Sequence, residues 1–318
     1  MTAINNKHLH ICQVFLSRGD GGLEKHVAEL ANCLSQSGKV SVIADEMYRQ
    51  KFAASVDFYP IDASSSRYSP FLILRMRRLL KQINPDVIHA HAGKAACMIA
   101  LIKSGFKSQK LVVTRHNTTN PSAYYLNKFD ASIAVSQMVA DSEPGVEWNV
   151  IENGTQPLGV SDQADSIQQP AIVTVGRLVK IKCLDYVLKA WKNPDAHLYI
   201  VGDGPERESL EKQAKALKLK NIHFVGFTDR VGDYLAKAHL MLMPSLKEGA
   251  PYALVEALLA KVPVASTDVG NAASLLPPKA IIPMEDHRAI RAIIEESLQD
   301  PENFSRAFDD SFRYAEEN

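Results

Sequence analysis

The sequence predicts an α/β protein made of two doubly wound domains, each with a parallel sheet covered by helices on both faces. Short apolar runs alternate with helical patterns along most of the chain, an order typical of parallel strands joined by crossover helices. This alternation stops in the polar stretch 156–170 and then restarts, which indicates a linker between two domains. A length of 318 residues suits two domains, since domains commonly have about 150 residues each.

The first domain is expected over 1–160. Its helices are predicted where apolar residues recur at helical spacing and Gly or Pro follows the last turn. They lie in GLEKHVAELANCLSQSG, PFLILRMRRLLKQINP and GKAACMIALIKSG. The strands are predicted in HLHICQVFL, KVSVIAD, DVIHAH, KLVVTRHN, FDASIAVS and WNVIENG.

The second domain is expected over 161–318. Its predicted strands are AIVTVG, AHLYIVG, IHFVG, LMLMPS and VPVAST, and its helices are CLDYVLKAWK, RESLEKQAKAL, the region of VGDYLAKA and a segment from Pro251 onward. In doubly wound sheets ligands bind beyond the carboxyl ends of the strands. The loops that follow the strands are therefore where a site is expected.

The composition is that of a soluble, cytoplasmic globular protein. Apolar residues make up 46% of the chain and charged residues 23%. No apolar run approaches the ~20 residues of a membrane-spanning helix, and the N-terminal residues do not have the pattern of a secretion leader. The four cysteines are widely spaced and form no CxxC pair, which indicates reduced thiols.

Charge is unevenly distributed, although the formal net charge is zero. Residues 1–150 hold 17 Lys and Arg against 12 Asp and Glu, a balance of +5, so the remainder carries −5. A mildly basic N-terminal half suits an anionic membrane surface or an anionic substrate. Nucleic acid is not expected as a partner, because it calls for a much stronger imbalance.

One predicted helix of the first domain, RYSPFLILRMRRLLKQ, combines cations with apolar residues. Basic amphipathic helices of this kind can lie on anionic lipid. An ordinary domain helix with a solvated basic face has the same pattern, so both interpretations stay open. The residues concerned are Phe71, Leu72, Leu74, Leu79, Arg75, Arg77, Arg78 and Lys81, with Lys103, Lys107 and Lys110 nearby in the sequence.

The loop after the first strand is rich in glycine. Gly19, Gly21 and Gly22 precede a helix, where backbone N–H groups and the helix dipole favour an anion. The dinucleotide fingerprint needs a third Gly where Glu24 stands, so a nicotinamide cofactor held with Asp45 is not expected. A tight turn that needs Gly for its backbone angles is the alternative.

Two cations follow the first strand of the second domain. Arg177 and Lys182 stand where they can clamp a diphosphate and neutralise a leaving group, whereas Lys180 is expected to point outward. A solvated loop would have the same residues. Gly202, after the next strand, lies in a short turn that needs no ligand to explain it.

Two acids flank the turn before a late apolar helix, in SLKEGAPYALVEALLAKVPVAS. An acid near a helix N-terminus is favourable in itself, which explains Glu248. Glu256 lies deeper, among apolar residues, where a carboxylate is costly to bury unless it is hydrogen-bonded. Pro251 fits the start of the helix and leaves the N–H groups of its first turn free for an anion.

Taken together, these segments resemble glycosyltransferase family 4. GGLEKHVAEL, PDVIHAH, VVTRHN, VIENG, VGRLVKIK, VGDGPERESL, HFVGFTDRV, MPSLKEGAPYALVEAL and VPVASTDVG stand in the family's order and spacing, over about residues 8–275. The resemblance implies the GT-B fold, with two Rossmann-like domains facing each other across a cleft. It also implies retaining transfer from a nucleotide sugar held mainly by the second domain, to an acceptor held mainly by the first.

The resemblance also implies roles for individual residues. Glu248 and Glu256 match the family's pair of acids, the first near the hydroxyls of the transferred sugar and the second on the ribose. Arg177 and Lys182 match the cations on the diphosphate, and His116 matches a histidine near the transferred sugar or the acceptor. The implied catalytic set is Arg177, Lys182, Glu248 and His116, and the implied donor-binding set is Gly21, Gly22, Gly202, Phe227, Gly249, Ala250, Tyr252, Ala253, Leu254 and Glu256.

No metal ion or other cofactor is expected. The sequence contains no D-x-D pair of the kind that holds a divalent ion on a diphosphate. His89 and His91 alternate on one face of a strand, but two histidines without a third ligand do not predict a metal site. A lone histidine at a strand end, such as His116, is also commonly just a satisfied polar residue.

Three positions depart from the family's pattern. Cys183 and Lys261 stand where the family usually has Gly, and the region of Ser274 lacks the usual Gly-Gly and later Glu. A degenerate relative that binds nucleotide or glycan without turnover is therefore one alternative, and a sugar-nucleotide epimerase is another.

The sequence thus predicts a hexosyltransferase-type enzyme of the cytoplasm, or of the inner face of a membrane with peripheral contact. Its expected donor is a nucleotide sugar, UDP-linked by preference. Its expected acceptor is a hydroxyl of a glycan or glycolipid, such as bacterial lipopolysaccharide or another surface polysaccharide.

Overall fold

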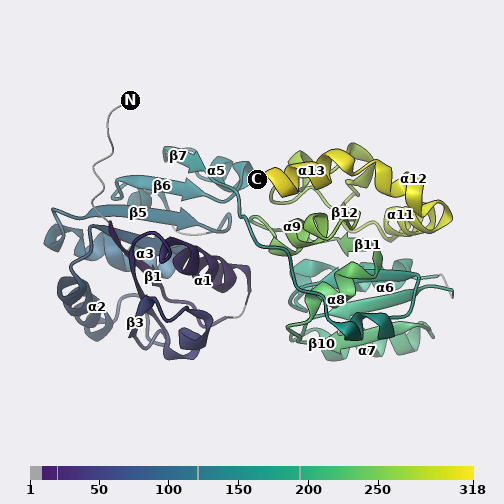
Figure 1. Cartoon of the computed structure of the whole chain (residues 1–318), viewed down its shortest axis with the longest axis horizontal. Helices are drawn as coiled ribbons and strands as arrows, with labels where there is room; N and C mark the ends of the chain where they lie inside the picture. Colours follow the sequence, from purple (N-terminus) through teal and green to yellow (C-terminus); the bar gives the residue numbers. More distant parts are fainter. Residues whose placement is uncertain (1–8, 20, 120–121, 193–194) are drawn as a thin grey trace. The chain divides into compact units, whose positions relative to one another are not determined.

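The computed structural model describes residues 9–19, 21–119, 122–192 and 195–318. The chain forms two compact units, Met1–Asn153 and Gly154–Asn318. Each unit contains a parallel sheet with helices on its faces, so the predicted fold of two Rossmann-like α/β domains is confirmed (Figure 1). The division falls after Asn153, whereas the sequence analysis places it after residue 160. Most of the N-terminal stretch for which no secretion leader is expected lies outside the described residues.

The first unit contains a seven-stranded sheet in the order β3-β2-β1-β4-β5-β6-β7, and its neighbouring strands run parallel. Between β1 and β4 the order of the strands reverses direction, which makes this the switch point of the sheet. The strands are β1 (His10–Phe15), β2 (Lys39–Ala44), β3 (Val56–Pro60), β4 (Val87–His91), β5 (Lys110–Arg115), β6 (Ala131–Ala134) and β7 (Trp148–Val150).

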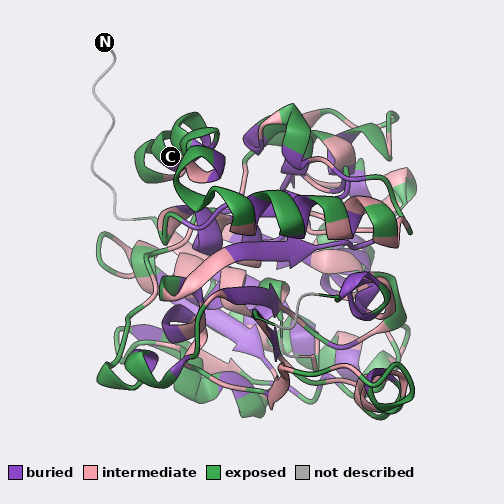
Figure 2. Ribbon diagram, turned by 90° about the vertical axis from the view of Figure 1, so that its right-hand side faces the viewer, coloured by how far each residue is buried: buried purple, intermediate pink, exposed green. Residues whose placement is uncertain are grey.

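Side chains along β1 point alternately to the two faces of the sheet, and each face packs against different helices of the first unit. Cys12 and Val14 point to one face, in the same core cluster as residues of α2 (Pro70–Ile83) and α3 (Ala92–Ile102). Phe15 points to the other face and shares a cluster with residues of α1 (Gly22–Leu34). Figure 2, in which the second unit faces the viewer, shows that its strands too are largely buried and the outer sides of its helices largely exposed. The first unit also contains α4 (Ala123–Leu126), α5 (Gln137–Asp141) and the short 3-10 helices η1 (Glu46–Lys51) and η2 (Lys103–Gly105).

Strand β3 is absent from the sequence prediction. Among the described residues its one partner strand is β2, so it forms an edge of the sheet, and it ends in Pro60. An edge position accommodates proline, because one side of the strand makes no ladder hydrogen bonds. The segment has a mixed burial pattern and little apolar periodicity, so local sequence does not distinguish it from a loop.

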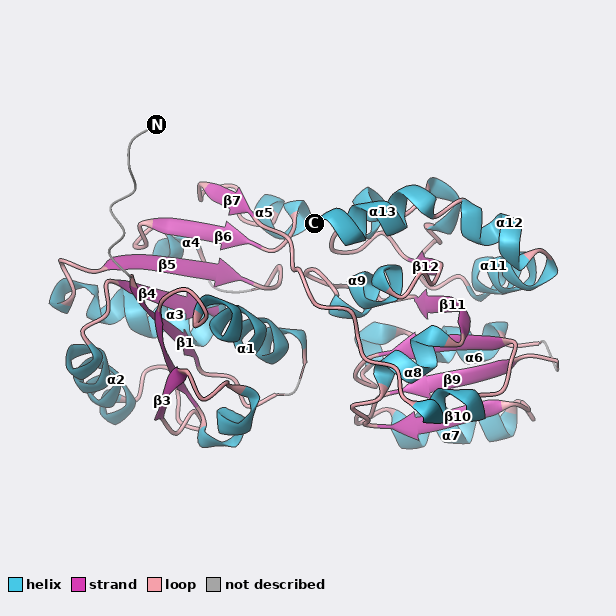
Figure 3. Ribbon diagram, viewed as in Figure 1, coloured by secondary structure: helices cyan, strands magenta, loops and turns pink. Residues whose placement is uncertain are grey.

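The second unit contains a five-stranded sheet in the order β10-β9-β8-β11-β12 (Figure 3). Its strands are β8 (Ala171–Val175), β9 (His197–Val201), β10 (Ile222–Gly226), β11 (Ala238–Met243) and β12 (Val264–Ser266). Here the strand order reverses direction between β8 and β11. The helices are α6 (Leu184–Ala190), α7 (Arg207–Ala216), α8 (Val231–Ala236), α9 (Tyr252–Leu259), α10 (Ala272–Leu275), α11 (His287–Gln299), α12 (Pro301–Arg306) and α13 (Asp309–Glu317), with the 3-10 helices η3 (Asp162–Ser166), η4 (Lys180–Lys182) and η5 (Pro278–Ala280).

The polar stretch 156–170, expected as a linker, packs on the second unit. The Ser161 amide and hydroxyl donate to the two carboxylate oxygens of Asp233, at 2.6 and 2.7 Å. These bonds hold the pKa of the buried Asp233 carboxyl below its usual range, with a further contribution from Arg230. Across the described residues, none of the helices is both long and apolar enough to cross a bilayer.

Helix α9 ends in a Schellman motif. The amide of Val262 donates to the carbonyl of Ala257 at 2.9 Å, and that of Lys261 donates to Leu258 at 3.0 Å. This motif needs a left-handed residue at the first position past the cap, which is usually glycine. Lys261 holds that position with φ +59°. Its ammonium pairs with Glu316 and lies 5.6 Å from the ring centre of Phe312, both in α13.

Cys183 is also left-handed, with φ +51°, at the junction of η4 and α6. Both departures from the family's glycines therefore fall where the backbone conformation favours glycine. The chain makes the left-handed turns in spite of the side chains, so the substitutions leave the local backbone path intact.

We expect Lys261→Gly to be more stable than Lys261→Ala by about 1 kcal/mol, because alanine keeps the strain of a left-handed L-residue and glycine removes it. Both variants lose the same ion pair with Glu316, which is largely exposed and contributes little. The difference between their free energies of unfolding, measured by urea denaturation, therefore isolates the backbone effect. At a position inside a helix, by contrast, the alanine variant would be the more stable of the two by about 1 kcal/mol. Finding alanine to be the more stable replacement would contradict the motif described for α9.

Candidate active site

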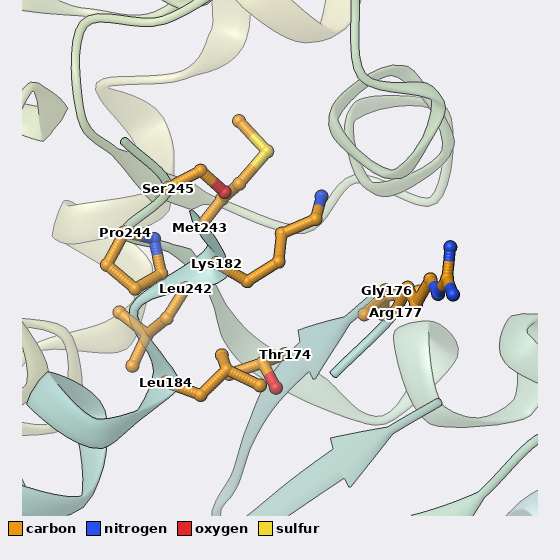
Figure 4. Close-up of a pocket in the computed structure, with 10 residues that line it drawn as sticks. Thr174, Gly176, Arg177, Lys182, Leu184, Leu242, Met243, Pro244 and Ser245 are labelled. Atoms are coloured by element: carbon orange, nitrogen blue, oxygen red, sulfur yellow. The ribbon is translucent and has the colours of Figure 1, made fainter. Parts of the chain in front are cut away.

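The carboxyl end of β8 leads into a loop that carries the two predicted cations. Arg177 is two residues beyond the strand, and Lys182 ends η4 just before α6. Both line one pocket with Gly176 and with residues at the end of β11. Figure 4 shows the side chain of Lys182 lying across this pocket and that of Arg177 extending away from it. Lys180 is exposed, as expected.

An ion pair joins this loop to the loop that follows β11. The Lys182 ammonium donates to Glu248 Oε1 at 2.5 Å, and the side chains are 21% and 14% exposed. This limited exposure weakens screening by salt. Arg177, by contrast, has an exposed side chain with no carboxylate partner among the described residues. The structure therefore unites Lys182 with Glu248 and leaves Arg177 at the rim of the same pocket.

Close backbone packing fixes the position of the Arg177 loop. The Gly176 amide donates to Val201 at 3.0 Å, and the Leu178 amide donates to Asp203 at 2.9 Å. Gly202 has φ +130°, and a Cβ atom there would lie 2.0 Å from the Gly176 carbonyl oxygen. Gly202, implied as a donor-binding residue, thus has a structural role in this close approach of the loops after β8 and β9.

The loop before α9 is held in a similar way. A Cβ atom on Gly270 would lie 2.8 Å from the Gly249 carbonyl oxygen and 3.0 Å from Pro251 Cδ. Pro251 is the residue before the first helical turn, as its sequence position predicts. Glu256 is 8% exposed, within α9. The first turn of the helix and the Glu248 carboxylate therefore belong to one short, tightly packed segment.

The other implied donor-binding residues occupy different environments. The side chains of Leu254 and Tyr252 are buried, and Leu254 belongs to the core cluster of the second unit, so only its backbone can reach a ligand. Ala250 and Ala253 are half-buried. Phe227, after β10, is 74% exposed and available for stacking.

Two polar side chains near this pocket escape the sequence analysis. Ser245 is fully buried and lines the pocket, yet its hydroxyl has no protein hydrogen-bond partner among the described residues. Asn271 is buried beside Gly270, and neither atom of its amide has a partner within the same residues. Buried polar atoms normally find partners, so both are further candidates for ligand contact. No local motif marks a buried serine or asparagine, and burial alone reveals them.

In the first unit, Gly21 and Gly22 stand at the start of α1, and both are exposed. Asp45, considered as a ribose ligand, instead caps η1 by accepting from the Met47 amide at 3.4 Å. It also lies 3.4 Å from Arg18 Nε. Asp45 therefore has structural partners within the first unit.

His116 follows β5 and meets other histidines. Its Nε2 lies 3.2 Å from His91 Nδ1, and its ring centre lies 4.7 Å from that of His26 in α1. Burial holds the pKa of His116 well below its usual range, with further lowering by His26 and His89. The sequence shows no third ligand for the pair His89 and His91, but the structure brings His26, from α1, and His116 close to His91. His26 is distant in sequence, and its position follows only from the packing of α1 on the sheet.

Comparisons with known proteins show which family the chain belongs to. Residues 20–142 match the family described as Glycosyltransferase Family 4, and residues 162–312 match the family described as Glycosyl transferases group 1. The chain is 34% identical over 263 residues to 2-deoxystreptamine N-acetyl-D-glucosaminyltransferase of Niallia circulans, covering 69% of this chain and 68% of the relative. It is 24% identical to the lipopolysaccharide core biosynthesis glycosyltransferase LpsE of Rhizobium meliloti, covering 78% and 76%.

Among solved structures, HepE of Anabaena in complex with UDP-glucose has the same fold, with a TM-score of 0.84 at 19% identity and coverage of 98% of this chain and 95% of that one. The fold, the matched families and the relatives define a glycosyltransferase with two Rossmann-like domains of the GT-B class. The chain belongs to the family 4 glycosyltransferases, and the predicted hexosyltransferase class of enzyme is confirmed.

Proposed function

We propose that this enzyme transfers a sugar from a UDP-sugar to a hydroxyl of a growing glycan, with retention of configuration at the anomeric carbon. The observation that carries the proposal is the pocket at the ends of β8 and β11, where Lys182 pairs with Glu248 and Arg177 stands at the rim. Cations beside an acid suit a donor that has a diphosphate at one end and sugar hydroxyls next to it.

In the proposed reaction, the bond between the anomeric carbon and the diphosphate oxygen breaks, and its electron pair leaves with the diphosphate. The acceptor oxygen forms the new bond to carbon and gives up its proton. Negative charge thus develops on the leaving oxygen. In this proposal Arg177 and Lys182 stabilise that charge, and the N–H groups at the start of α9 add their dipole.

The two acids have separate proposed roles. Glu248 accepts hydrogen bonds from hydroxyls of the transferred sugar, next to the reacting carbon. Glu256, one turn into α9, accepts from the ribose diol. Carboxylates are suited to such contacts because each accepts several hydrogen bonds. His116 is proposed to lie beside the transferred sugar or the acceptor.

The donor and acceptor are proposed from the named relatives. The solved HepE complex contains UDP-glucose, and LpsE is named for lipopolysaccharide core biosynthesis. We therefore propose a UDP-hexose donor and an acceptor from lipopolysaccharide or another bacterial surface glycan. We also propose that the enzyme acts in the cytoplasm, at the inner face of the membrane.

Helix α2 is the proposed membrane contact. Leu72, Met76 and Leu80 form its buried stripe, so Leu72 belongs to the core and is not available to lipid. The exposed side instead carries Phe71, 86% exposed, and Leu74, 52% exposed. The cations Arg75, Arg77, Arg78 and Lys81 are exposed around them.

The basic surface continues beyond α2. Arg77 lies over Gly105, where a Cβ atom would be 3.3 Å from Arg77 Nε. Lys103 and Lys107 are exposed on either side of Gly105. Each such cation near an anionic bilayer contributes about 1 kcal/mol, and an apolar side chain beside them can enter the headgroup layer. We propose anionic lipid as the occupant of this surface.

The proposed roles of Arg177 and Lys182 at the diphosphate, together called the clamp, are tested by Arg177→Ala and Lys182→Ala. Each variant should lose about 3–4 kcal/mol of transition-state stabilisation, a few hundredfold or more in kcat/KM, because a preorganised charge at the leaving group is removed. The assay follows UDP release from a panel of UDP-sugars with a bacterial glycan acceptor. Lys180→Ala is the matched control and should be mild, since Lys180 is exposed on the same loop. Thermal melting verifies that each variant is folded, and near-normal turnover in either clamp variant would refute the proposed roles.

Transfer is proposed to need no metal ion, because the two cations and the helix N-terminus meet the charge on the diphosphate. Activity should therefore persist after exhaustive dialysis against EDTA and should not rise when Mg²⁺ or Mn²⁺ is added. Activity that disappears with EDTA and returns only with one of these ions would show that the charge assignment is wrong.

Membrane contact predicts that the protein floats with phosphatidylglycerol-containing liposomes and not with pure phosphatidylcholine. Phe71→Ser and Arg78→Glu should each reduce recovery several-fold, by removing the apolar anchor and by reversing one charge. Lys215→Glu, a charge reversal in the second unit, serves as the control. Negligible recovery with both kinds of vesicle would rule out the proposed contact.

A further inference from the structure

Three histidines converge on one face of the first sheet. Register and alternation place Gln13, His89 and His91 on the face opposite to that of Ile88 and Ala90, which pack in the cluster with α2 and α3. His116 extends just past β5 on the side covered by α1, where His26 approaches it. This group lies at the carboxyl end of β4, at the switch point of the sheet, which is where doubly wound sheets bind ligands.

The distances within the group suit a metal ion. His26, His91 and His116 each offer a ring nitrogen, and the three nitrogens lie within 4.8 Å of one another. The closest pair, His91 Nδ1 and His116 Nε2, is 3.2 Å apart. Two nitrogen ligands of a tetrahedral zinc ion, with bonds of about 2.0 Å, stand about 3.3 Å apart. His91 and His116 therefore already have the spacing of two zinc ligands. The ring of His26 has to move only a short distance toward them to become the third.

Supporting contacts orient the rings. His91 Nε2 lies 2.6 Å from Gln13 Oε1, a pure acceptor, so the proton is on Nε2 and the lone pair of Nδ1 faces the other histidines. A histidine ligand typically has its second nitrogen held by an oxygen in this way. Gln13 is itself fully buried. His26 forms a hydrogen bond with the buried Asn153. His89 is directed elsewhere, with Nε2 2.7 Å from Thr114 Oγ1.

All three rings are uncharged at neutral pH. Burial lowers the pKa of His26 to about 4 and holds those of His91 and His116 well below their usual range. Metal ions bind the neutral form of imidazole, so no proton has to be removed first. The hydrogen bond between His91 and His116 gives way to the ion when the His116 proton moves from Nε2 to Nδ1.

We propose that His26, His91 and His116 form a binding site for a zinc-class transition-metal ion. Three imidazoles and no carboxylate favour Zn²⁺, Co²⁺, Ni²⁺ or Cu²⁺ over Mg²⁺ and Ca²⁺, which prefer oxygen. Three protein ligands leave a fourth position for water or an anion. The inference stands on the first unit alone and is separate from the proposed transfer, which uses no metal.

The test is metal binding by the full chain, with any purification tag removed and the protein stripped with EDTA and dialysed. Co²⁺ titration should give the intense visible bands of four-coordinate cobalt, saturating at about one equivalent. Zn²⁺ should abolish these bands by displacement. His26→Ala and His116→Ala should each weaken binding at least a hundredfold, and Gln13→Leu, which removes a supporting oxygen, should weaken it about 10- to 100-fold.

His223→Ala is the matched control. His223 belongs to another close pair, with Nε2 3.1 Å from His197 Nδ1 in the second unit, and its loss should leave cobalt binding unchanged. His26 is only half-buried, so His26→Ala should fold, as circular dichroism would verify. The proposal fails if the stripped protein binds less than a stoichiometric amount of Co²⁺, or if the His26→Ala and His116→Ala variants bind it as the parent does.

A second measurement connects this site to the proposed function, and only this measurement, not the metal site itself, rests on that function. An ion bound by His116 would occupy the ring proposed to lie beside the sugar or the acceptor, so Zn²⁺ should inhibit transfer in the parent and not in His26→Ala. Binding is measured without substrates, so failure of the transfer proposal would leave the cobalt result intact. Zn²⁺ that binds without inhibiting would separate the metal site from the reaction.

Discussion

The ion pair between Lys182 and Glu248 is the interaction on which the rest of the second unit's site depends. It joins the loop after β8 to the loop after β11, two neighbouring strands between which the sheet changes direction. At such a point the crossover helices diverge and leave the strand ends accessible. Close packing at Gly202 and Gly270 holds the two loops in place, so the charges meet in a fixed position instead of on flexible arms.

Much of this arrangement follows from local sequence. The alternation of apolar runs predicts both sheets, and the charges after β8 and β11 identify the ion pair that joins these two loops. The alternation of side chains along β4 predicts that His89 and His91 point to the same face of the sheet. Prediction stops where a contact joins distant segments. His26 reaches its partners only because α1 lies across the sheet, and the burial of Ser245 depends on elements that no local pattern relates.

The two residues that replace the family's glycines bear on whether the enzyme is degenerate. Both Cys183 and Lys261 occupy left-handed positions and keep the backbone path. Cys183 follows Lys182 directly, yet Lys182 still reaches Glu248. The buried thiol of Cys183 points away from solvent, and desolvation raises its pKa, so it adds no reactive group to the pocket. The replacements therefore affect local stability more than the chemistry of the site, which weakens the case for a chain that binds without turnover.

The charge states of the two units suggest a division of labour under the proposed function. In the second unit Lys182 is paired with Glu248. Under the proposed function, binding of a diphosphate would exchange this carboxylate for a phosphate, and Glu248 would then accept hydrogen bonds from the sugar. Lys182 has therefore already lost part of its hydration on folding, which lowers the desolvation cost of binding a ligand. In the first unit burial keeps four histidines neutral. Neutral rings can hydrogen-bond to the hydroxyls of a sugar or an acceptor. The same lack of charge leaves their lone pairs available to a soft cation, so one physical cause, burial without an acidic partner, underlies both the proposed contact with the sugar or the acceptor and the proposed metal site.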